Sequence, residues 1–321
     1  MTTPNSKYTQ AFSAAIANYR DSAANDVLAN NALLLHLSKR NNVDTFDGGV
    51  EITEQVLFSE VSATGWYSGS EVLDTSSTEV LTSANFAIKQ HYSHITQSGL
   101  EEIQNSGESQ MIKLIEAKIE AAMSTSKNAV SKALFFSNTE HSGKAIGGLQ
   151  HLVADAPTTG TVGGIDAATN TWWRNVVIDL SNESLNPGST PEHMIRAINL
   201  GFLRTNRGSD MVDVIVAGDT YFSYFEQALQ PNQRFLNAEM AKVGFKAYEH
   251  KGAMVIHDPH CSATRMYGLN TKFVFFRPHK DRFFKIDDLK RSVNQDAWIY
   301  PIWFAGNLTI SSRKRHFVIV A

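Results

Sequence analysis

The chain has 321 residues, a hydrophobic share of 42%, a charged share of 19% and a formal net charge of −3. This ordinary composition excludes wholesale disorder, and the near balance of charge argues against a protein held to nucleic acid mainly by phosphate contacts. The single cysteine, Cys261, excludes an internal disulfide, and the absence of a long apolar run or a signal-like start excludes a spanning helix and predicts a cytoplasmic compartment.

The first part of the chain predicts short helical pieces. Phe12, Ile16 and Tyr19 recur at helical spacing within residues 8–20, and a second apolar run follows over residues 27–37. Both pieces are short and weakly capped, so neither is stable alone. We expect an arm that lies against another surface.

From Gly48 the pattern changes to the alternation of extended strands. Apolar side chains fall on one side over residues 50–58, and alternation resumes over residues 86–92 after a middle rich in glycine and serine. These features predict a long two-stranded excursion with a loose tip. Since an isolated two-stranded ribbon is marginally stable in water, we expect outside support.

Residues 107–136 predict the clearest element, a long helix with one apolar stripe. Apolar residues recur every three or four positions from Met111 to Leu134, and Asn105 precedes Glu108 at the spacing of a capping box. A helix of about 30 residues is roughly 45 Å long. It is expected to form the spine of the molecule.

The remainder predicts short helices segregated from mostly antiparallel strands. Helices are expected over 190–205, beginning with Thr190 and Pro191, and over 221–229. Strands are expected over 174–180, 211–216, 253–256, 272–276 and 298–304, with a final hairpin of 308–310 and 317–320. This arrangement predicts an α+β fold.

The residues offer little catalytic chemistry. His257, His260 and Cys261 could ligate zinc, but no second cluster has metal-ligand spacing. The glycines of 160–170 match neither the P-loop nor the dinucleotide fingerprint, and no nucleophile elbow is present. We nominate no catalytic residue, metal or cofactor. A metal-dependent hydrolase built around His257 and His260 remains the least favoured alternative.

The order of parts and the local sequence resemble a known family. The segments that carry the resemblance, in order, are LANNALLLHL, GGVEI, WYSGSEVLDT, SGLEEIQNSG, IGGLQHLVAD and GTVGGIDAATNTWWRN. Over residues 28–321 the chain resembles the Hong Kong 97-type major capsid proteins of tailed bacteriophages. The resemblance implies an N-terminal arm (1–47), an extended loop (48–98), a peripheral domain with the spine helix (99–144), an axial domain (145–290) and a return to the peripheral domain (291–321).

The same resemblance implies a function and partners. It implies a non-enzymatic subunit that self-assembles through hexamers and pentamers into an icosahedral shell around double-stranded DNA, bound without sequence specificity. The other implied partners are a portal and a separate scaffolding protein contacted by Phe12, Ile16 and Tyr19, with a decoration protein as an optional addition and no membrane. Such a protein is assembled in the host bacterial cytoplasm and resides in the virion. A bacterial nanocompartment shell is the alternative with the same fold.

Charge is distributed unevenly along the chain. Residues 41–88 contain no Lys or Arg and carry a charge of −8, whereas residues 246–291 carry +5. We expect the acidic segment to lie on a basic surface of a neighbouring subunit. The acidic candidates are Glu51, Glu54, Glu60, Glu71, Asp74 and Glu79, and the basic candidates are Lys280, Arg282, Lys285, Lys290, Arg291, Arg313, Lys314 and Arg315.

Overall fold

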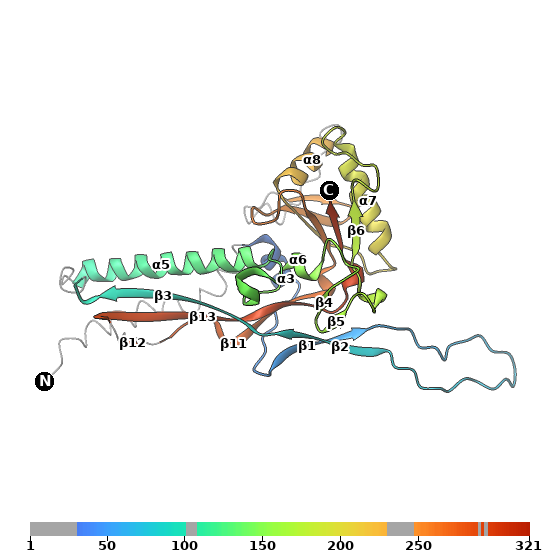
Figure 1. Ribbon diagram of the computed structural model, residues 1–321, viewed down its shortest axis with the longest axis horizontal. Coiled ribbons are helices and arrows are strands. Elements are labelled where there is room, and N and C mark those ends of the chain that lie inside the picture. Colours follow the sequence, from blue (N-terminus) through green and yellow to red (C-terminus); the bar gives the residue numbers. More distant parts are fainter. Residues whose placement is uncertain (1–30, 101–107, 230–246, 288–289, 292–294) are drawn as a thin grey trace.

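The computed structural model describes residues 31–100, 108–229, 247–287, 290–291 and 295–321. The molecule has an elongated half, built on the longest helix and a narrow sheet, and a compact half built on a broader sheet (Figure 1). The predicted α+β class is confirmed. Within the described ranges, no helix has the length and apolar character needed to cross a membrane.

The long helix of the elongated half is α5 (Glu108–Ala133). Ile119, Met123 and Val130 recur on its buried side, which is the stripe that the sequence predicts. The helix ends three residues before the predicted boundary, where the Leu149 amide donates to the Leu134 carbonyl and Gly148 lies against the last turn. The expected cap at Asn105 lies outside the described residues.

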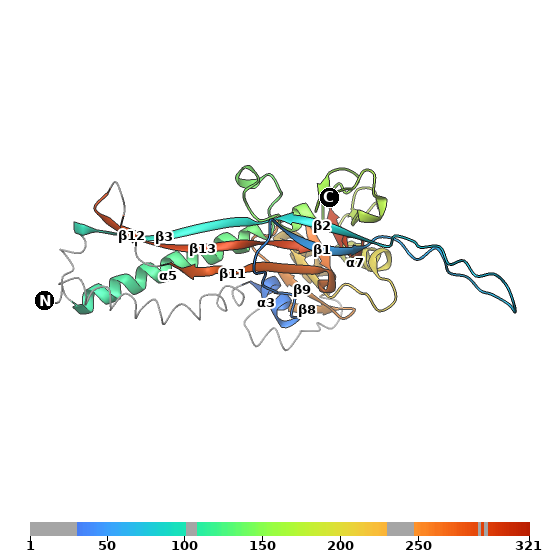
Figure 2. The same ribbon diagram turned by 90° about the horizontal axis from the view of Figure 1, so that it is seen from below.

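One face of a narrow sheet lies along α5 (Figures 1 and 2). The sheet contains β3 (Lys89–Ser98), β11 (Val274–Ile286), β12 (Lys290–Arg291) and β13 (Ala297–Ile310). β3 pairs with β13 from Ser98↔Ala297 to Lys89↔Gly306. Two predictions are therefore corrected. Residues 89–98 belong to this sheet and not to the two-stranded excursion, and residues 308–310 end β13 instead of beginning a hairpin.

The first described residues lie at the junction of the two halves. Helix α3 (Ala32–Lys39) begins at Asn31, whose side chain accepts hydrogen bonds from the Leu33 and Leu34 amides. Leu33 and Leu34 are fully buried. The chain then runs parallel to β11 through the bridges Val43↔Phe276 and Phe46↔His279. The predicted helix containing Phe12, Ile16 and Tyr19 lies outside the described residues.

The compact half contains a six-stranded sheet in the order β6-β14-β10-β7-β9-β8. Its strands are β6 (Val176–Asp179), β7 (Val214–Ala217), β8 (Ala247–His250), β9 (Ala253–His257), β10 (Met266–Leu269) and β14 (Phe317–Val320). Helices α7 (Glu192–Thr205) and α8 (Asp219–Leu229) pack together and against the sheet. Pro191 is the N-cap residue of α7, one position later than predicted.

Candidate functional site

An antiparallel ribbon projects from the junction of the two halves (Figures 1 and 2). It pairs β1 (Glu51–Leu57) with β2 (Leu81–Ala87), from Glu51↔Ala87 to Leu57↔Leu81. Side chains on its inner face are buried against the body: Ile52, Glu54, Val56, Ala84 and Phe86. Beyond these strands, residues 58–80 extend away from the body as a long tip (Figure 2).

A buried ion pair ties the ribbon to the elongated half. Glu54 is 6% exposed, and its Oε1 accepts hydrogen bonds from Arg277 Nε (2.8 Å) and Thr309 Oγ1 (2.8 Å). Arg277 also pairs with Asp44. Burial opposes the charge of Arg277, but Glu54 and Asp44 together raise its pKa. Glu54 thus has partners within its own chain and is removed from the predicted intersubunit set.

The compact half holds the ribbon from the other side. The Asn85 amide donates to the Gly163 carbonyl (2.9 Å), in the turn between β4 (Thr161–Val162) and β5 (Ile165–Asp166). The Phe58 ring lies 5.5 Å from the Trp172 ring. At the start of the tip, Glu60 pairs with Arg207 at 2.8 Å, although both side chains are mostly exposed. The direction of the ribbon is therefore set within one subunit.

The tip exposes large apolar side chains. Trp66 and Val72 are fully exposed, and Tyr67 and Leu73 are more than half exposed. Single exposed apolar residues are ordinary, but a group of them on a projecting segment marks an interaction surface. Three of the predicted acidic candidates, Glu71, Asp74 and Glu79, lie exposed on the tip with them, and Glu51 is exposed at the body end of the ribbon. A hydrogen bond from the Ser76 amide lowers the pKa of Asp74, which keeps it charged.

The narrow sheet presents a basic and aromatic surface on its face away from α5. Tyr92, Trp303 and Lys285 are cross-strand neighbours on this face, and Thr96, Ile299 and Lys290 follow. Arg282 lies over the Trp303 ring at 5.5 Å. We call the residues Tyr92, Arg282, Lys285, Lys290 and Trp303 the basic sheet face. The charge pattern of the sequence predicts the cations of this face but not its aromatic members, which the alternation of 297–305 could have indicated.

The predicted basic candidates divide into exposed and buried groups. Lys280 and Arg291 are exposed and loosely paired, with Asp47 (3.7 Å) and Asp296 (3.8 Å). Lys290 pairs with Asp287 at 2.7 Å. Arg282 and Lys285 have no carboxylate within 4 Å among the described residues.

Arg313 requires a correction. It is 1% exposed within its own subunit, and its guanidinium donates to the Leu152 carbonyl and to Asn175 Oδ1. It therefore cannot form part of an exposed basic surface. Of its two neighbours in the predicted run, Lys314 is exposed, and Arg315 is half-buried near the Thr205 carbonyl.

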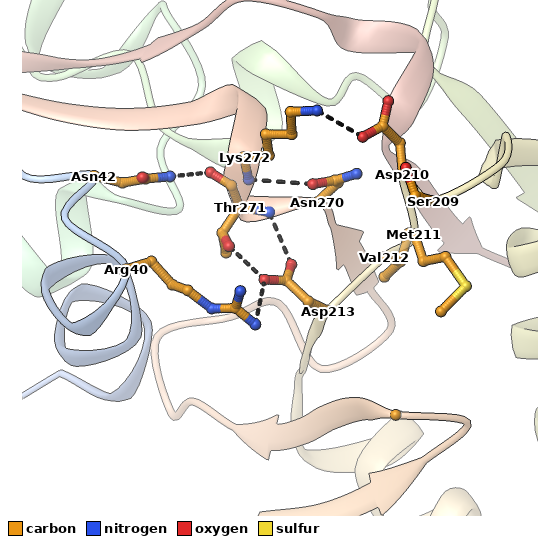
Figure 3. Close-up of a pocket in the computed structure, with 11 residues that line it drawn as sticks. Arg40, Asn42, Ser209, Asp210, Met211, Val212, Asp213, Asn270, Thr271 and Lys272 are labelled. Carbon is orange, nitrogen blue, oxygen red and sulfur yellow. Dashed lines mark hydrogen bonds and ion pairs between the residues drawn. The ribbon is translucent and has the colours of Figure 1, made fainter.

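A polar cavity beside the N-terminal segment has a volume of about 470 Å³ (Figure 3). Asp213 lies at its wall, where it accepts hydrogen bonds from Thr271 and pairs with Arg40 at 3.5 Å. Burial alone would raise the pKa of Asp213, but hydrogen bonds from His36 and Thr271 lower it. Lys272 pairs with Asp210 across the same cavity. The charges of this cavity neutralise one another, and the arrangement joins α3 to the compact half.

The His257–Cys261 string has no metal-site geometry. His257 Nε2 contacts Asp219, and Asp258 accepts hydrogen bonds from Asn31 and from the His260 amide. Burial raises the pKa of the Cys261 thiol to about 12. In the part of the chain that the structure describes, no three His, Cys, Asp or Glu side chains converge on one point. The geometry therefore offers nothing to the hydrolase alternative.

Comparisons place the fold among capsid proteins. The capsid asymmetric unit of cyanophage A-1(L) has a TM-score of 0.63 at 14% identity, covering 87% of this chain and 90% of that chain. The capsid of the native GTA particle has a TM-score of 0.55 at 10% identity (88% and 89%), and the capsid of Myoviridae phage XM1 has 0.50 at 12% (89% and 91%). No family model and no curated protein matches the sequence. The predicted Hong Kong 97-type fold is confirmed.

Proposed function

We propose that this chain, which has the phage capsid fold, is the major capsid protein of a tailed bacteriophage. Many copies would form an icosahedral shell around double-stranded DNA. One observation carries the proposal beyond the fold: the tip of residues 58–80 exposes Trp66, Tyr67 and Val72 far from any core of its own subunit. Such exposure is unfavourable in water and becomes favourable when another copy covers it. A structural role of this kind requires no catalytic residue.

The proposed contact joins the ribbon tip of one copy to the basic sheet face of another. Glu71, Asp74 and Glu79 supply negative charge, and Arg282, Lys285 and Lys290 supply the complement. Trp66 and Tyr67 match the exposed Tyr92 and the half-buried Trp303 in chemistry. Each exposed ion pair contributes only about 0–1 kcal/mol. The charges therefore mainly steer and align the copies, and apolar burial supplies most of the affinity.

The proposed function also assigns the remaining parts and partners. Residues 1–47 would be the N-terminal arm, 99–144 and 291–321 the peripheral domain and 145–290 the axial domain. Because β3 and β11 both pair with β13, we assign these two strands to the peripheral domain as well. The extended loop would begin at residue 48 and end near Ile88 instead of residue 98, since β3 pairs with β13. The partners would be a portal and a separate scaffolding protein that contacts Phe12, Ile16 and Tyr19, with a decoration protein as an optional addition. Assembly would occur in the bacterial cytoplasm, and the product would reside in the virion.

Electron microscopy of the expressed protein tests this function. Negatively stained samples of the chain, alone and with a scaffolding protein encoded beside it, should contain closed shells. A stable monomer that forms no cage under either condition would contradict the proposal.

Charge reversal tests the proposed contact. The variant E71K/D74K/E79K should lose assembly. Mixing it with R282E/K285E/K290E should restore assembly, because the reversed charges on the tip of one variant meet the reversed charges on the basic sheet face of the other. The matched control E120K/E192K/E249K changes the same number of exposed acidic residues elsewhere and should assemble. Normal assembly of the tip variant at every salt concentration would refute the contact.

A further inference from the structure

A cluster of basic side chains lies beneath the root of the ribbon. Its members come from four segments: Lys89 and His91 from β3, His141 from η1 (Glu140–Gly143), His151 from α6 (Leu149–Leu152) and Arg313 from η4 (Arg313–Arg315). Lys89 Nζ donates to the Gly143 carbonyl, and Arg313 Nε donates to the Leu152 carbonyl. We call these five residues the root basic cluster.

A cavity of about 190 Å³ opens beside this cluster. Lys89, His151, Asn85, Asn138 and Asn307 are among its lining residues. No carboxylate lies among the described residues that line it. Since one water occupies about 30 Å³ of liquid, the cavity has room for a small polyatomic anion with water.

Lys89 and Arg313 carry the positive charge of the root basic cluster, and in the described part of the chain neither has a carboxylate partner. Arg313 is 1% exposed, bonds only to neutral oxygens, and has an Nη1 group without a partner among the described residues. The buried Nε2 of His91 is likewise unpartnered there. Burial lowers the pKa of Arg313 to about 10, and burial with the charges of Arg313 and Lys89 lowers that of His151 to about 4. Arg313 does not line the cavity itself, but its charge acts on His151 at the cavity wall, next to Lys89. Buried cations are costly unless paired, so these two positive charges favour an anion in the cavity.

We propose that this cavity is an anion-binding site, which takes a carboxylate or an inorganic phosphate. The Lys89 ammonium has three donors and uses one on Gly143, so two remain for the ligand. Asn85 and Asn138 can add amide donors from the cavity wall. Asn85 belongs to β2 and Lys89 begins β3, so the bound anion holds the root of the ribbon where it joins the body.

Inorganic phosphate is the probe for the site. It is added to the unassembled full chain at constant ionic strength, with sodium chloride as the balancing salt, and the thermal unfolding midpoint is measured. We expect phosphate to raise the midpoint by roughly 2–4 °C. Lys89→Met should abolish the shift, and Lys89→Arg should retain it. Asn138→Ala changes an exposed residue at the cavity and should weaken the shift, so the test survives if Lys89→Met does not fold.

A matched control separates the site from overall charge. Lys132→Met removes an exposed lysine of α5 and should keep the phosphate shift. Loss of the shift in this control would overturn the proposal. If phosphate has no effect, but Lys89→Met fails to assemble while Lys132→Met assembles, the ligand is a carboxylate of a second copy. No phosphate shift together with no difference in assembly overturns the site. A chain that binds phosphate and forms no shell would reject the capsid function alone.

Discussion

Glu54 and Arg277 carry opposite charges into a poorly solvated position at the base of the ribbon. The two side chains are 8% and 20% exposed, and Thr309 completes the hydrogen bonding of the carboxylate. A buried pair of this kind contributes little to stability compared with an apolar replacement of both partners. Loss of one partner, however, leaves the other as an unpaired buried charge, which is strongly destabilising. The arrangement therefore specifies where the ribbon attaches.

Arg277→Met is expected to lower the free energy of unfolding by about 3–5 kcal/mol, because Glu54 stays buried without its cation. Urea unfolding measures the change. Lys280→Met, three residues along and 67% exposed, is the control and should change stability by less than about 1 kcal/mol. Adding Glu54→Gln to Arg277→Met should recover part of the loss. Equal stability of the two single variants would contradict the argument.

The half-buried His151 and the fully buried His316 predict acid sensitivity. Burial, with Arg313 and Lys89 nearby, lowers the pKa of His151 to about 4. Burial and Arg313 lower that of His316 to about 3, against the opposing effects of Asp213 and the Ser312 backbone. The unfolded chain takes up these protons near pH 6.5 and the folded chain does not. Stability should therefore fall as pH drops from about 6.5 toward 4, by roughly 3 kcal/mol for His151 alone.

Unfolding free energies at pH 7, 6, 5 and 4 measure this loss. His151→Gln should flatten the slope, because the substituted side chain does not titrate. His94→Gln, on the exposed face of β3, is the control and should leave the slope unchanged. A wild-type stability independent of pH over this range would show that the histidines take up protons in the folded chain as readily as in the unfolded chain, which contradicts the prediction.

At the scale of elements, the turn between β4 and β5 packs tightly against β2. Gly163 has φ +60°, and a Cβ atom there would lie 2.8 Å from the Cβ of Ala84. Gly164 has φ +76° but faces open space. Both positions therefore require a residue that adopts a positive φ, and at Gly163 there is in addition no room for a side chain.

Gly164→Ala is expected to lower the free energy of unfolding by about 1 kcal/mol, the cost of its backbone conformation. Gly163→Ala should cost about 1–3 kcal/mol more, since its methyl group overpacks the ribbon. Chemical denaturation of the two variants side by side measures the difference. Equal costs would mean that the turn does not press on β2.

At the scale of the whole molecule, one part of the ribbon contributes to the stability of the subunit and another part to the proposed assembly. Its root is packed between the two halves, while residues 61–77 reach beyond every described element of the body (Figure 2). The fold should therefore survive loss of the tip, and the proposed contacts between copies should not.

Replacing residues 61–77 by Asn-Gly, a two-residue turn suited to antiparallel strands, tests this separation. We expect an unfolding free energy within about 1 kcal/mol of the wild type, because Phe58 and Glu60 keep their partners, together with loss of shells in electron micrographs. A second variant keeps the original length of the tip but replaces its residues by glycine and serine. It shows whether assembly depends on the side chains of the tip or on its length. Normal shells from the shortened chain would exclude the tip as the joining element.

The sequence by itself determined the features that depend on local periodicity and composition. The apolar stripe of α5, the alternation of β1 and the absence of lysine and arginine over residues 41–88 are properties of neighbouring residues. Helix and strand periods are visible in such windows without knowledge of distant partners. The acidic ribbon and the long helix were predictable for this reason.

Only the tertiary structure decided which charges remain available and where strands pair. Glu54 and Glu51 look alike in the sequence, as do Arg313 and Lys314, but the first of each pair is buried and the second exposed. Likewise, β3 joins the elongated half because its partner, β13, lies about two hundred residues further along the chain. Burial and long-range pairing depend on the packing of distant segments, and no local pattern encodes them.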